Sequence, residues 1–435
     1  MNRQLVNVAW LLVLVACPVA GAASGVGAEV DAVYARSETL YLDLHQHPEL
    51  SGHEQQTAQK LAAGLRELGF EVTTGIGGTG VIGLLKNGNG PVIMLRTELD
   101  ALPVVENTGL PFASTVRTKD DSGAEVGVMH ACGHDIHMAS WMGTARIMVG
   151  TRDRWRGTLM MLAQPAEETV SGAEKMLRDG LLTRFPRPQF ALAVHDDPRA
   201  PGGIVGYHAG PILSNADSLR ITIFGTGGHG ARPEATVDPI VIAARTVLAL
   251  QTIVSREVSP FDAAVVTVGS IHGGTKNNII PPEVTLLLTV RTLTDPMRKR
   301  VLKSIDRIVK AEAAAAGAPR EPTIERYEGT DALINDPALT QRVSTALKRE
   351  LGADRVRDMP PEMASEDFAE FQKAGVPTLM LRIGATPQAT FDAAMRSGAE
   401  LPALHSPLFI PDRERAIKAA IAAEVIGLRE LMPAK

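Results

Sequence analysis

Short apolar segments alternate with amphipathic segments over most of the chain. Residues 53–70 place Ala58, Leu61 and Leu65 on one stripe at helical spacing, which predicts an amphipathic helix. A second pattern, a short and nearly all-apolar run typical of a strand buried on both faces, occurs at residues 92–95, 158–163, 190–194 and 378–381. The alternation of helices with buried strands predicts an α/β fold.

The pattern changes between residues 214 and 327. Strand, helix, strand, strand, helix and strand patterns follow one another there, at residues 218–224, 238–256, 263–271, 284–292, 296–316 and 323–327. This order is close to that of a ferredoxin-like α+β sandwich. We therefore expect a compact domain at 214–327, inserted into a larger domain whose two parts are residues 30–213 and 328–435.

The first 22 residues have the pattern of a secretory signal. The basic residue Arg3 precedes an apolar run over residues 5–16, and small residues follow up to Ala22. Because this run is short for a membrane span, we expect cleavage after Ala22 and export, with the periplasm as the destination. An uncleaved membrane anchor and a lipoprotein anchored through Cys17 are the alternatives.

Composition narrows the classes of function. The chain has 44 Lys and Arg against 49 Asp and Glu, so no basic excess exists to bind nucleic acid, and aromatic residues make up only 4%. The two cysteines, Cys17 and Cys132, cannot build a disulfide scaffold. Export would leave Cys132 as the only free thiol in an oxidising compartment, and metal ligation is the leading reason to keep one there.

Side chains with ligand chemistry follow each of the four buried runs. They are, in chain order, Asp100, the pair Glu167 and Glu168, His195 and, in a later loop, His405. Ligands of open α/β sheets bind at the carboxyl ends of the strands. We therefore expect these side chains to converge.

Cys132 and His134 lie two residues apart, directly before a predicted helix over residues 136–149. Thiolate and imidazole together suit zinc, cobalt or nickel better than magnesium or calcium. Two other interpretations are a buried cysteine beside a helix-capping histidine, and a Cys132 nucleophile activated by a histidine.

The candidate ligands exceed the needs of one ion. Cys132, His134, Glu168, His195 and His405 make five, whereas a single zinc site takes three or four, so a pair of metal ions is the natural inference. Two adjacent carboxylates can divide the work, one binding a cation while the other accepts a proton from water. Asp100 is suited to bond the free ring nitrogen of a ligating histidine.

In their order and spacing, these motifs resemble the aminoacylase/carboxypeptidase group of dinuclear metallohydrolases, in the amidohydrolase branch with hippurate hydrolase and the auxin-conjugate hydrolases. The resemblance covers nearly the whole mature chain. Its segments are His45-Gln46-His47-Pro48-Glu49-Leu50, Asp100-Ala101-Leu102-Pro103, the Cys132/His134 segment, Gln164-Pro165-Ala166-Glu167-Glu168, Gly227-Gly228-His229-Gly230-Ala231, Asn278-Ile279-Ile280-Pro281, Ser365-Glu366-Asp367-Phe368 and His405-Ser406-Pro407.

The resemblance implies a zinc-exopeptidase-like catalytic domain split in sequence, with the inserted domain as lid and as the interface of a homodimer. It implies that Cys132 bridges two divalent ions, Zn²⁺ by preference with Mn²⁺, Co²⁺ or Ni²⁺ as alternatives, and that Glu167 is the general base. The metal shells would be completed by His134, Glu168, His195 and His405. His229 would polarise the scissile carbonyl in the partner's site, and Asn278 and Arg291 match positions that face the substrate.

Two positions depart from the family pattern. Glu98 stands where an aspartate is usual, and Asp196-Asp197-Pro198 replaces the usual apolar and aromatic residues after His195. The histidines at 45, 47 and 53 are expected to be structural rather than ligands.

The implied reaction is hydrolysis of the amide bond of N-acyl amino acids or small dipeptides by a metal-activated water. Three alternatives stay open. They are a cysteine amidase built on Cys132, a non-catalytic exported protein that binds metal or peptide, and an exported aminopeptidase or carboxypeptidase of the same group.

Overall fold

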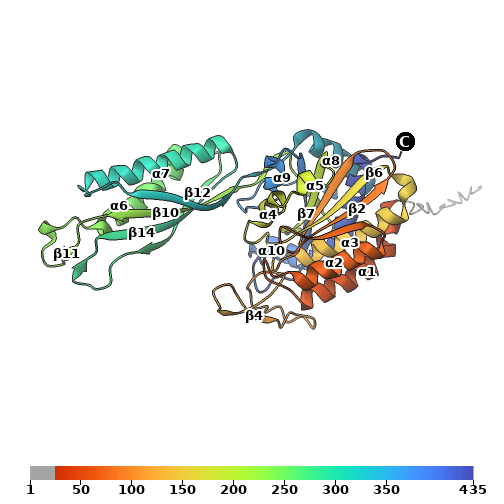
Figure 1. Ribbon diagram of the computed structural model, residues 1–435, viewed down its shortest axis with the longest axis horizontal. Helices are drawn as coiled ribbons and strands as arrows, with labels where there is room; N and C mark the ends of the chain where they lie inside the picture. Colours follow the sequence, from red (N-terminus) through yellow and green to blue (C-terminus); the bar gives the residue numbers. More distant parts are fainter. Residues whose placement is uncertain (1–24, 435) are drawn as a thin grey trace, which may run out of the picture.

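The computed structural model describes residues 25–434, which form two domains (Figure 1). The predicted signal sequence, with Cys17, lies outside the described residues. The larger domain is built on an eight-stranded sheet with the order β1-β2-β6-β3-β7-β18-β8-β17. Its strands are β1 (Glu71–Ile76), β2 (Gly80–Asn87), β3 (Val92–Glu98), β6 (Gly157–Gln164), β7 (Phe190–Pro201), β8 (Val205–Tyr207), β17 (Val356–Asp358) and β18 (Thr378–Thr386).

The four buried runs predicted from the sequence are the central strands β3, β6, β7 and β18. β3 pairs in parallel with β6 and β7, and β7 pairs in parallel with β18, whereas β1 and β2 add antiparallel edges. The length of the apolar run predicted that His195 follows this strand. β7 continues to Pro201, so His195 lies inside the strand instead. The parallel strands bring their carboxyl ends to one edge.

Helices cover both faces of this sheet. Alternate residues of β3 show the two layers, because Ile93 and Leu95 belong to one apolar cluster and Met94 belongs to another. The first cluster includes α1 (Val26–Gln46), α2 (Gln55–Glu67), α3 (His134–Gly150), α8 (Pro337–Leu351) and α11 (Arg413–Leu431); the second includes α4 (Gly172–Arg178), α5 (Leu181–Arg184) and α9 (Ala369–Lys373). Burial on both sides explains why these strands have uninterrupted apolar patterns.

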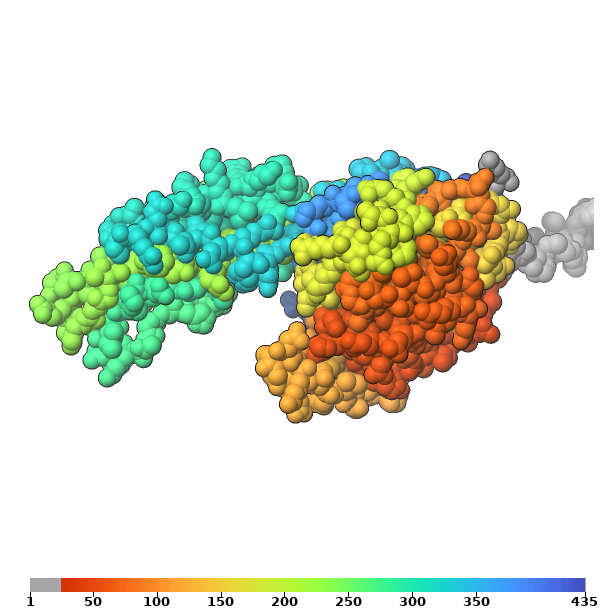
Figure 2. Space-filling view, in the orientation of Figure 1, coloured from red at the N-terminus to blue at the C-terminus, as the bar shows by residue number. Residues whose placement is uncertain are grey.

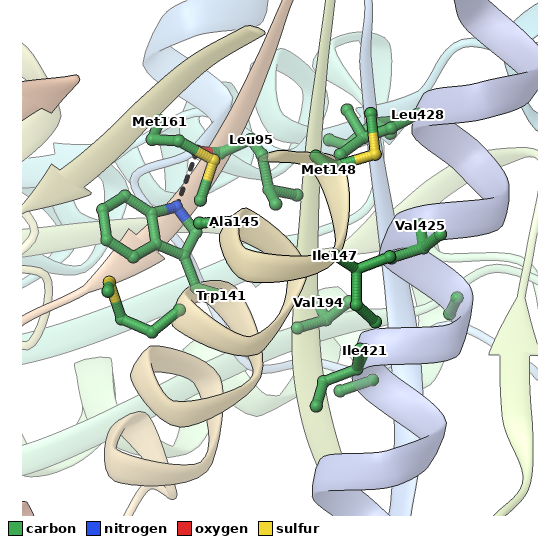
Figure 3. Packing of buried hydrophobic residues seen from close by; sticks show 14 of the residues in the cluster. Leu95, Trp141, Ala145, Ile147, Met148, Met161, Val194, Ile421, Val425 and Leu428 are labelled. Carbon is green, nitrogen blue, oxygen red and sulfur yellow. Dashed lines mark hydrogen bonds between the residues drawn. The ribbon is translucent and has the colours of Figure 1, made fainter. Parts of the chain in front are cut away.

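Helix α3 anchors the site to the core. Its Trp141 is fully buried and donates its indole N–H to the carbonyl of Leu95, at 3.0 Å (Figure 3). About two turns later, Ile147 and Met148 lie among side chains of β7 and α11 (Figure 3). The helix begins at His134, two residues before the predicted start, so its first residue belongs to the candidate site.

The second domain has the strand and helix order that the sequence predicted. Its four-stranded antiparallel sheet has the order β12-β14-β10-β15, and the chain passes through it as strand, helix, strand, strand, helix, strand. The elements are β10 (Asn215–Phe224), α6 (Pro239–Thr252), β12 (Ala264–His272), β14 (Glu283–Thr292), α7 (Asp295–Ala315) and β15 (Thr323–Thr330). Asp238 and Thr294 cap the two helices, each followed by a proline suited to a first helical turn.

The inserted domain projects from the catalytic domain as a separate lobe (Figure 2). Two short strands, β11 (Gly228–His229) and β13 (Ile279–Ile280), pair at its far end, away from the large sheet (Figure 1). One side of this lobe is apolar and exposed: Val241 and Leu248 of α6 are 56% and 72% accessible, and Ile271 of β12 is half exposed. β12 is also an edge strand, so its outer hydrogen-bonding groups have no strand partner within the described residues.

Candidate active site

The predicted site residues of the catalytic domain come together at the carboxyl edge of the large sheet. Asp100 follows β3 by two residues, and Glu167 and Glu168 follow β6 by a short turn. His195 lies in β7, and His405 lies in a loop after α10 (Gln388–Ser397). Cys132 and His134 enter from the turn that starts α3.

A glycine allows the thiol and the imidazole to approach the sheet. Gly133, between Cys132 and His134, has φ +75°, a left-handed conformation that side chains other than glycine's rarely adopt. A Cβ at this position would lie 2.6 Å from the carboxylate of Asp196. The Cys-Gly-His turn therefore packs directly against the strand that carries His195.

Two histidines have their outer ring nitrogens fixed by backbone carbonyls. Nδ1 of His134 donates to the carbonyl of Asp100 at 2.8 Å, and Nδ1 of His195 donates to the carbonyl of Asp196 at 2.9 Å. Because a carbonyl only accepts, each Nδ1 carries a hydrogen, and in the neutral imidazole each Nε2 presents a lone pair. Both Nε2 atoms face the cluster: that of His195 is 3.6 Å from Cys132 Sγ, and that of His134 is 3.9 Å from both Glu167 Oε2 and Glu168 Oε1.

The donor set fits divalent cations. Within the described residues, the buried His134 Nε2, Glu168 Oε1 and Asp100 Oδ1 have no hydrogen-bond partner, and leaving such groups unsatisfied is costly. The ligand atoms of three sets each lie within 4.8 Å of one another: Cys132, His134 and His195; Cys132, Glu168 and His405; His134, Glu167 and Glu168. Since Cys132 belongs to two sets that otherwise differ, one thiolate can serve two ions.

The raised pKa values of the acidic groups in the cluster also indicate a site for cations. Burial and the nearby Glu366 and Glu168 raise the pKa of Glu167 well above its usual value, and burial raises the pKa of Glu168 to about 7. Burial and the carboxylate of Glu168 also raise the pKa of the Cys132 thiol. Cations bound among these groups would reverse each of these penalties.

A strained turn presents the two glutamates. Ala166 and Val170, on either side of the pair, have φ +51°, which is uncommon for alanine and strained for a β-branched residue. Buried Glu54 accepts the N–H of Ala166 at 2.9 Å, and Asp100 Oδ2 accepts the N–H of Glu168 at 2.9 Å. Glu54 was missed by the sequence reasoning, because a glutamate before an amphipathic helix gives no signal of burial.

A cavity of about 850 Å³ opens beside the cluster. Its wall includes Cys132, Glu167, Glu168, His195 and His405, together with apolar side chains such as Met363, Met380, Leu401 and Leu404. Arg291 of β14 reaches it from the inserted domain. Nη1 of Arg291 donates to the carbonyl of Met363 and to Ser365 Oγ, each at 3.2 Å, and no carboxylate within residues 25–434 pairs with this guanidinium.

His229 and Asn278 are not part of this cluster. Both are exposed at the far end of the inserted domain, where the N–H of Gly230 donates to the carbonyl of Asn278 at 2.9 Å. Neither lines the cavity of its own chain. The structure therefore brings together eight of the ten predicted site residues and leaves these two apart.

The histidines near the N-terminus are in structural contacts. Buried His45 joins Asp135 Oδ2, at 2.6 Å, to Glu106 Oε1, at 3.3 Å. His47 and His53 contact Asp43 and Asp121 at the surface. None of the three lies in the cysteine-centred donor sets.

This arrangement places the protein in the class of dinuclear metal-dependent hydrolases. The chain belongs to peptidase family M20/M25/M40, whose sequence pattern matches residues 94–395. It is 37% identical over 329 residues to N-acetyl-L-cysteine deacetylase of Bacillus subtilis, covering 75% of each chain, and 36% identical over 336 residues to hippurate hydrolase of Campylobacter jejuni, covering 77% of this chain and 84% of the relative. The resemblance inferred from the motifs is confirmed.

A solved structure supports the same classification. The YXEP protein of Bacillus subtilis, a dinuclear metal-binding peptidase from the M20 family, is 31% identical with a TM-score of 0.74, over 91% of this chain and 98% of that one. The predicted fold class, a split catalytic domain with an inserted α+β domain, is therefore confirmed.

Proposed function

We propose that the protein hydrolyses the amide bond of N-acyl amino acids or small dipeptide-like substrates, with two divalent ions and a glutamate general base. The observation that carries the proposal is the cluster of buried nitrogen and oxygen atoms without hydrogen-bond partners around the Cys132 sulfur, beside a cavity whose wall includes Arg291, an arginine without a carboxylate partner in residues 25–434. The relatives that hydrolyse hippurate and N-acetylcysteine act on amides of this size.

The proposed ligands are Cys132, shared between the ions, with His134, Glu168, His195 and His405. Zn²⁺ is preferred because a thiolate together with imidazoles suits zinc, and Mn²⁺, Co²⁺ or Ni²⁺ are the alternatives. The chemistry that two such ions supply when bound is polarisation of a carbonyl and acidification of water. Asp100 orients His134 and holds the backbone of Glu168, so it is a positioning residue.

Glu167 is the proposed general base. It is buried, it lines the cavity beside the proposed metal ligands, and a carboxylate in that position can take a proton from water and return it. The proton would pass from water to Glu167 and then to the nitrogen of the leaving amine. A cysteine nucleophile is disfavoured by the raised pKa of the Cys132 thiol, which lowers the thiolate fraction in the metal-free protein.

Arg291 is the proposed binding group for the substrate carboxylate. Its guanidinium is half buried, lies in the cavity wall and has only two neutral hydrogen-bond acceptors. An anionic substrate group would supply the missing charge partner. Asn278 would contact the substrate from the inserted domain of the partner.

A substrate panel tests this function. The purified protein should hydrolyse N-acyl amino acids, lose activity when a chelator removes divalent ions and regain it when they return. Replacing the free carboxylate of a substrate by its amide should lower kcat/KM about 10–100-fold, the value of one charge-assisted hydrogen bond. Activity that survives exhaustive chelation would favour the cysteine amidase. A preference for dipeptides would favour the aminopeptidase or carboxypeptidase.

We also propose a homodimer in which His229 completes the site of the partner chain. The exposed apolar side of α6 and the unpaired edge of β12 suit a self-complementary interface. The position of His229, exposed and outside the cavity of its own chain, is consistent with a role across subunits.

Mixed dimers measure that role. Chains with His229→Ala and chains with Glu167→Gln should each be inactive alone. After subunit exchange they should recover up to about a quarter of wild-type activity, since half of the dimers carry one intact site. Absence of recovery, with exchange demonstrated by differential tagging, would show that His229 does not act across the interface.

The proposed location is outside the cytoplasm, in the periplasm after cleavage following Ala22. The alternative is a lipid on Cys17. The mass of the N-terminal peptide from the cell-expressed protein separates the two, because the lipoprotein would begin with an acylated Cys17 and the cleaved form with Ala23.

A further inference from the structure

A histidine outside the proposed ligand set is held between two buried carboxylates. His137 lies one turn after His134 on α3 and is buried. Its Nδ1 is 3.0 Å from Glu98 Oε2, and its Nε2 is 3.2 Å from Asp196 Oδ1. Glu98 and Asp196 are the two positions noted above as departures from the family pattern, so both departures meet at one imidazole ring.

This ring supports the strand that carries His195. The backbone N–H of Asp196 lies 2.9 Å from His137 Nε2, and the carbonyl of the same residue accepts the hydrogen of His195 Nδ1 at 2.9 Å. The two imidazole rings also pack edge to face, with centroids 4.8 Å apart. The orientation of His195 therefore depends on the backbone of Asp196, which His137 also contacts.

Asp196 also contacts the other half of the site. Its carboxylate lies 2.6 Å from the position that a Cβ on Gly133 would take, against the turn that carries Cys132 and His134. Its Oδ2 is buried and has no hydrogen-bond partner within residues 25–434. The carboxylate of Asp196 thus adjoins both ligand-bearing segments, and its side-chain contacts there are with the imidazoles of His137 and His195.

The second carboxylate ties the ring to the core. Glu98 is paired with the fully buried Arg96, which in turn binds Glu366 at 2.7 Å and Asp367 at 3.3 Å. Arg96 contacts Glu98 Oε1, whereas His137 contacts Oε2 of the same carboxylate. A continuous series of contacts therefore runs from the sheet interior through Glu98 and His137 to Asp196 and His195.

We propose that Glu98 and Asp196 are positioning residues that act together through His137 to orient His195 and to raise the cation affinity of the cysteine-centred site. The inference rests on the proposed metal-dependent function. It assigns the strengthening of that site to two carboxylates that lie outside the cysteine-centred ligand sets. Partners that orient a metal-binding histidine typically change metal affinity about 10–100-fold when removed.

The test compares Asp196→Asn, Glu98→Gln and the double variant, with Glu424→Gln as the control. Glu424 is a buried carboxylate against the same helix, but it accepts from the hydroxyls of Ser140 and Thr144 and makes no hydrogen bond with His137. Zn²⁺ affinity is measured by competition with a chromophoric chelator, and the Co²⁺-loaded proteins are compared by their visible and thiolate charge-transfer absorption. The melting temperature of each metal-free protein is measured in parallel.

Each single variant should bind Zn²⁺ about 10–100-fold more weakly and show an altered Co²⁺ spectrum, while the control keeps the wild-type values. The double variant should lose less than the product of the two single losses, because both side chains act on one ring. Glu98→Gln also breaks the pair with the fully buried Arg96, so its metal-free melting temperature should fall, and every Zn²⁺ affinity is therefore measured at a temperature at which the metal-free protein is folded.

Three results would overturn the proposal. If the variants keep the wild-type Zn²⁺ affinity but melt at a lower temperature, Glu98 and Asp196 have only a structural role. If the affinity losses of the two single variants are fully additive in the double variant, the two residues act separately. A third Zn²⁺ per wild-type chain that disappears in Asp196→Asn would make Asp196 and His137 ligands instead. Failure of the proposed function is distinct, because the wild-type protein would then bind no Zn²⁺ and hydrolyse no substrate with it.

Discussion

Glu167→Gln is expected to lower kcat about 10²–10⁴-fold while the protein keeps two divalent ions per chain. The amide retains the size of the side chain and one acceptor oxygen, but it cannot take a proton from water. Burial and neighbouring carboxylates raise the pKa of Glu167 in the metal-free protein, so the neutral side chain should fold at least as well. Steady-state kinetics, metal analysis and a melting curve on the same sample measure all three expectations.

The adjacent Glu168 supplies the matched control for that experiment. Its Oε1 is an unpartnered buried atom, and its Oε2 is 3.5 Å from Nε2 of His405. Glu168→Gln should therefore lower metal content first, with activity partly restored by excess ion. Equal behaviour of the two variants would mean that the two carboxylates do not divide base and ligand roles, and unchanged turnover in Glu167→Gln would refute the assigned base.

Cys132→Ala should have the second largest effect, through the metal and not through nucleophilic chemistry. Cys132 is the only side chain that belongs to both the His195 set and the His405 set, so its loss weakens both ion positions. We expect a decrease in Zn²⁺ affinity of more than about 100-fold, beyond the usual cost of removing an outer partner. Chelator competition and metal analysis measure this loss.

The alternative hypothesis, in which Cys132 is the nucleophile of a cysteine amidase, predicts different results. A cysteine amidase would keep its activity after chelation and would lose it on alkylation of Cys132, with metal content irrelevant to turnover. Activity of Cys132→Ala that returns with excess Zn²⁺ or Co²⁺ would exclude a covalent role for the thiol, because no other cysteine exists in the described residues.

The central strands and their ligand-bearing ends could be predicted because burial on both faces leaves a clear pattern. β3, β6, β7 and β18 are short apolar runs, and the edge to which parallel strands point follows from the fold class. The inserted domain could also be predicted, because its hydrophobic pattern alternates between the strand period and the helix period in the order of a ferredoxin-like sandwich. The exact extent of β7 was not predictable, because polar residues after Val194 continue the strand.

The buried charged residues could not be predicted from the pattern of hydrophobic and polar positions. Arg96 looks like a surface residue in its strand, yet it is fully buried because Glu98 and a loop about 270 residues later supply its partners. The burial of Glu54, Glu98 and His137 was not predicted for the same reason: a pattern that equates charge with exposure cannot identify charges that are paired in the interior. The role of His229 could not be predicted for a different reason. The sequence of one chain does not say whether a residue acts in the site of its own subunit or in that of a partner.

The most direct measurement is anomalous scattering from crystals of the full protein grown with Zn²⁺, recorded on both sides of the zinc absorption edge. Two peaks flanking Cys132 Sγ, within bonding distance of His134, Glu168, His195 or His405, are the expected result. A map with no anomalous peak beside that sulfur would contradict the proposed dinuclear centre and the hydrolytic function that depends on it.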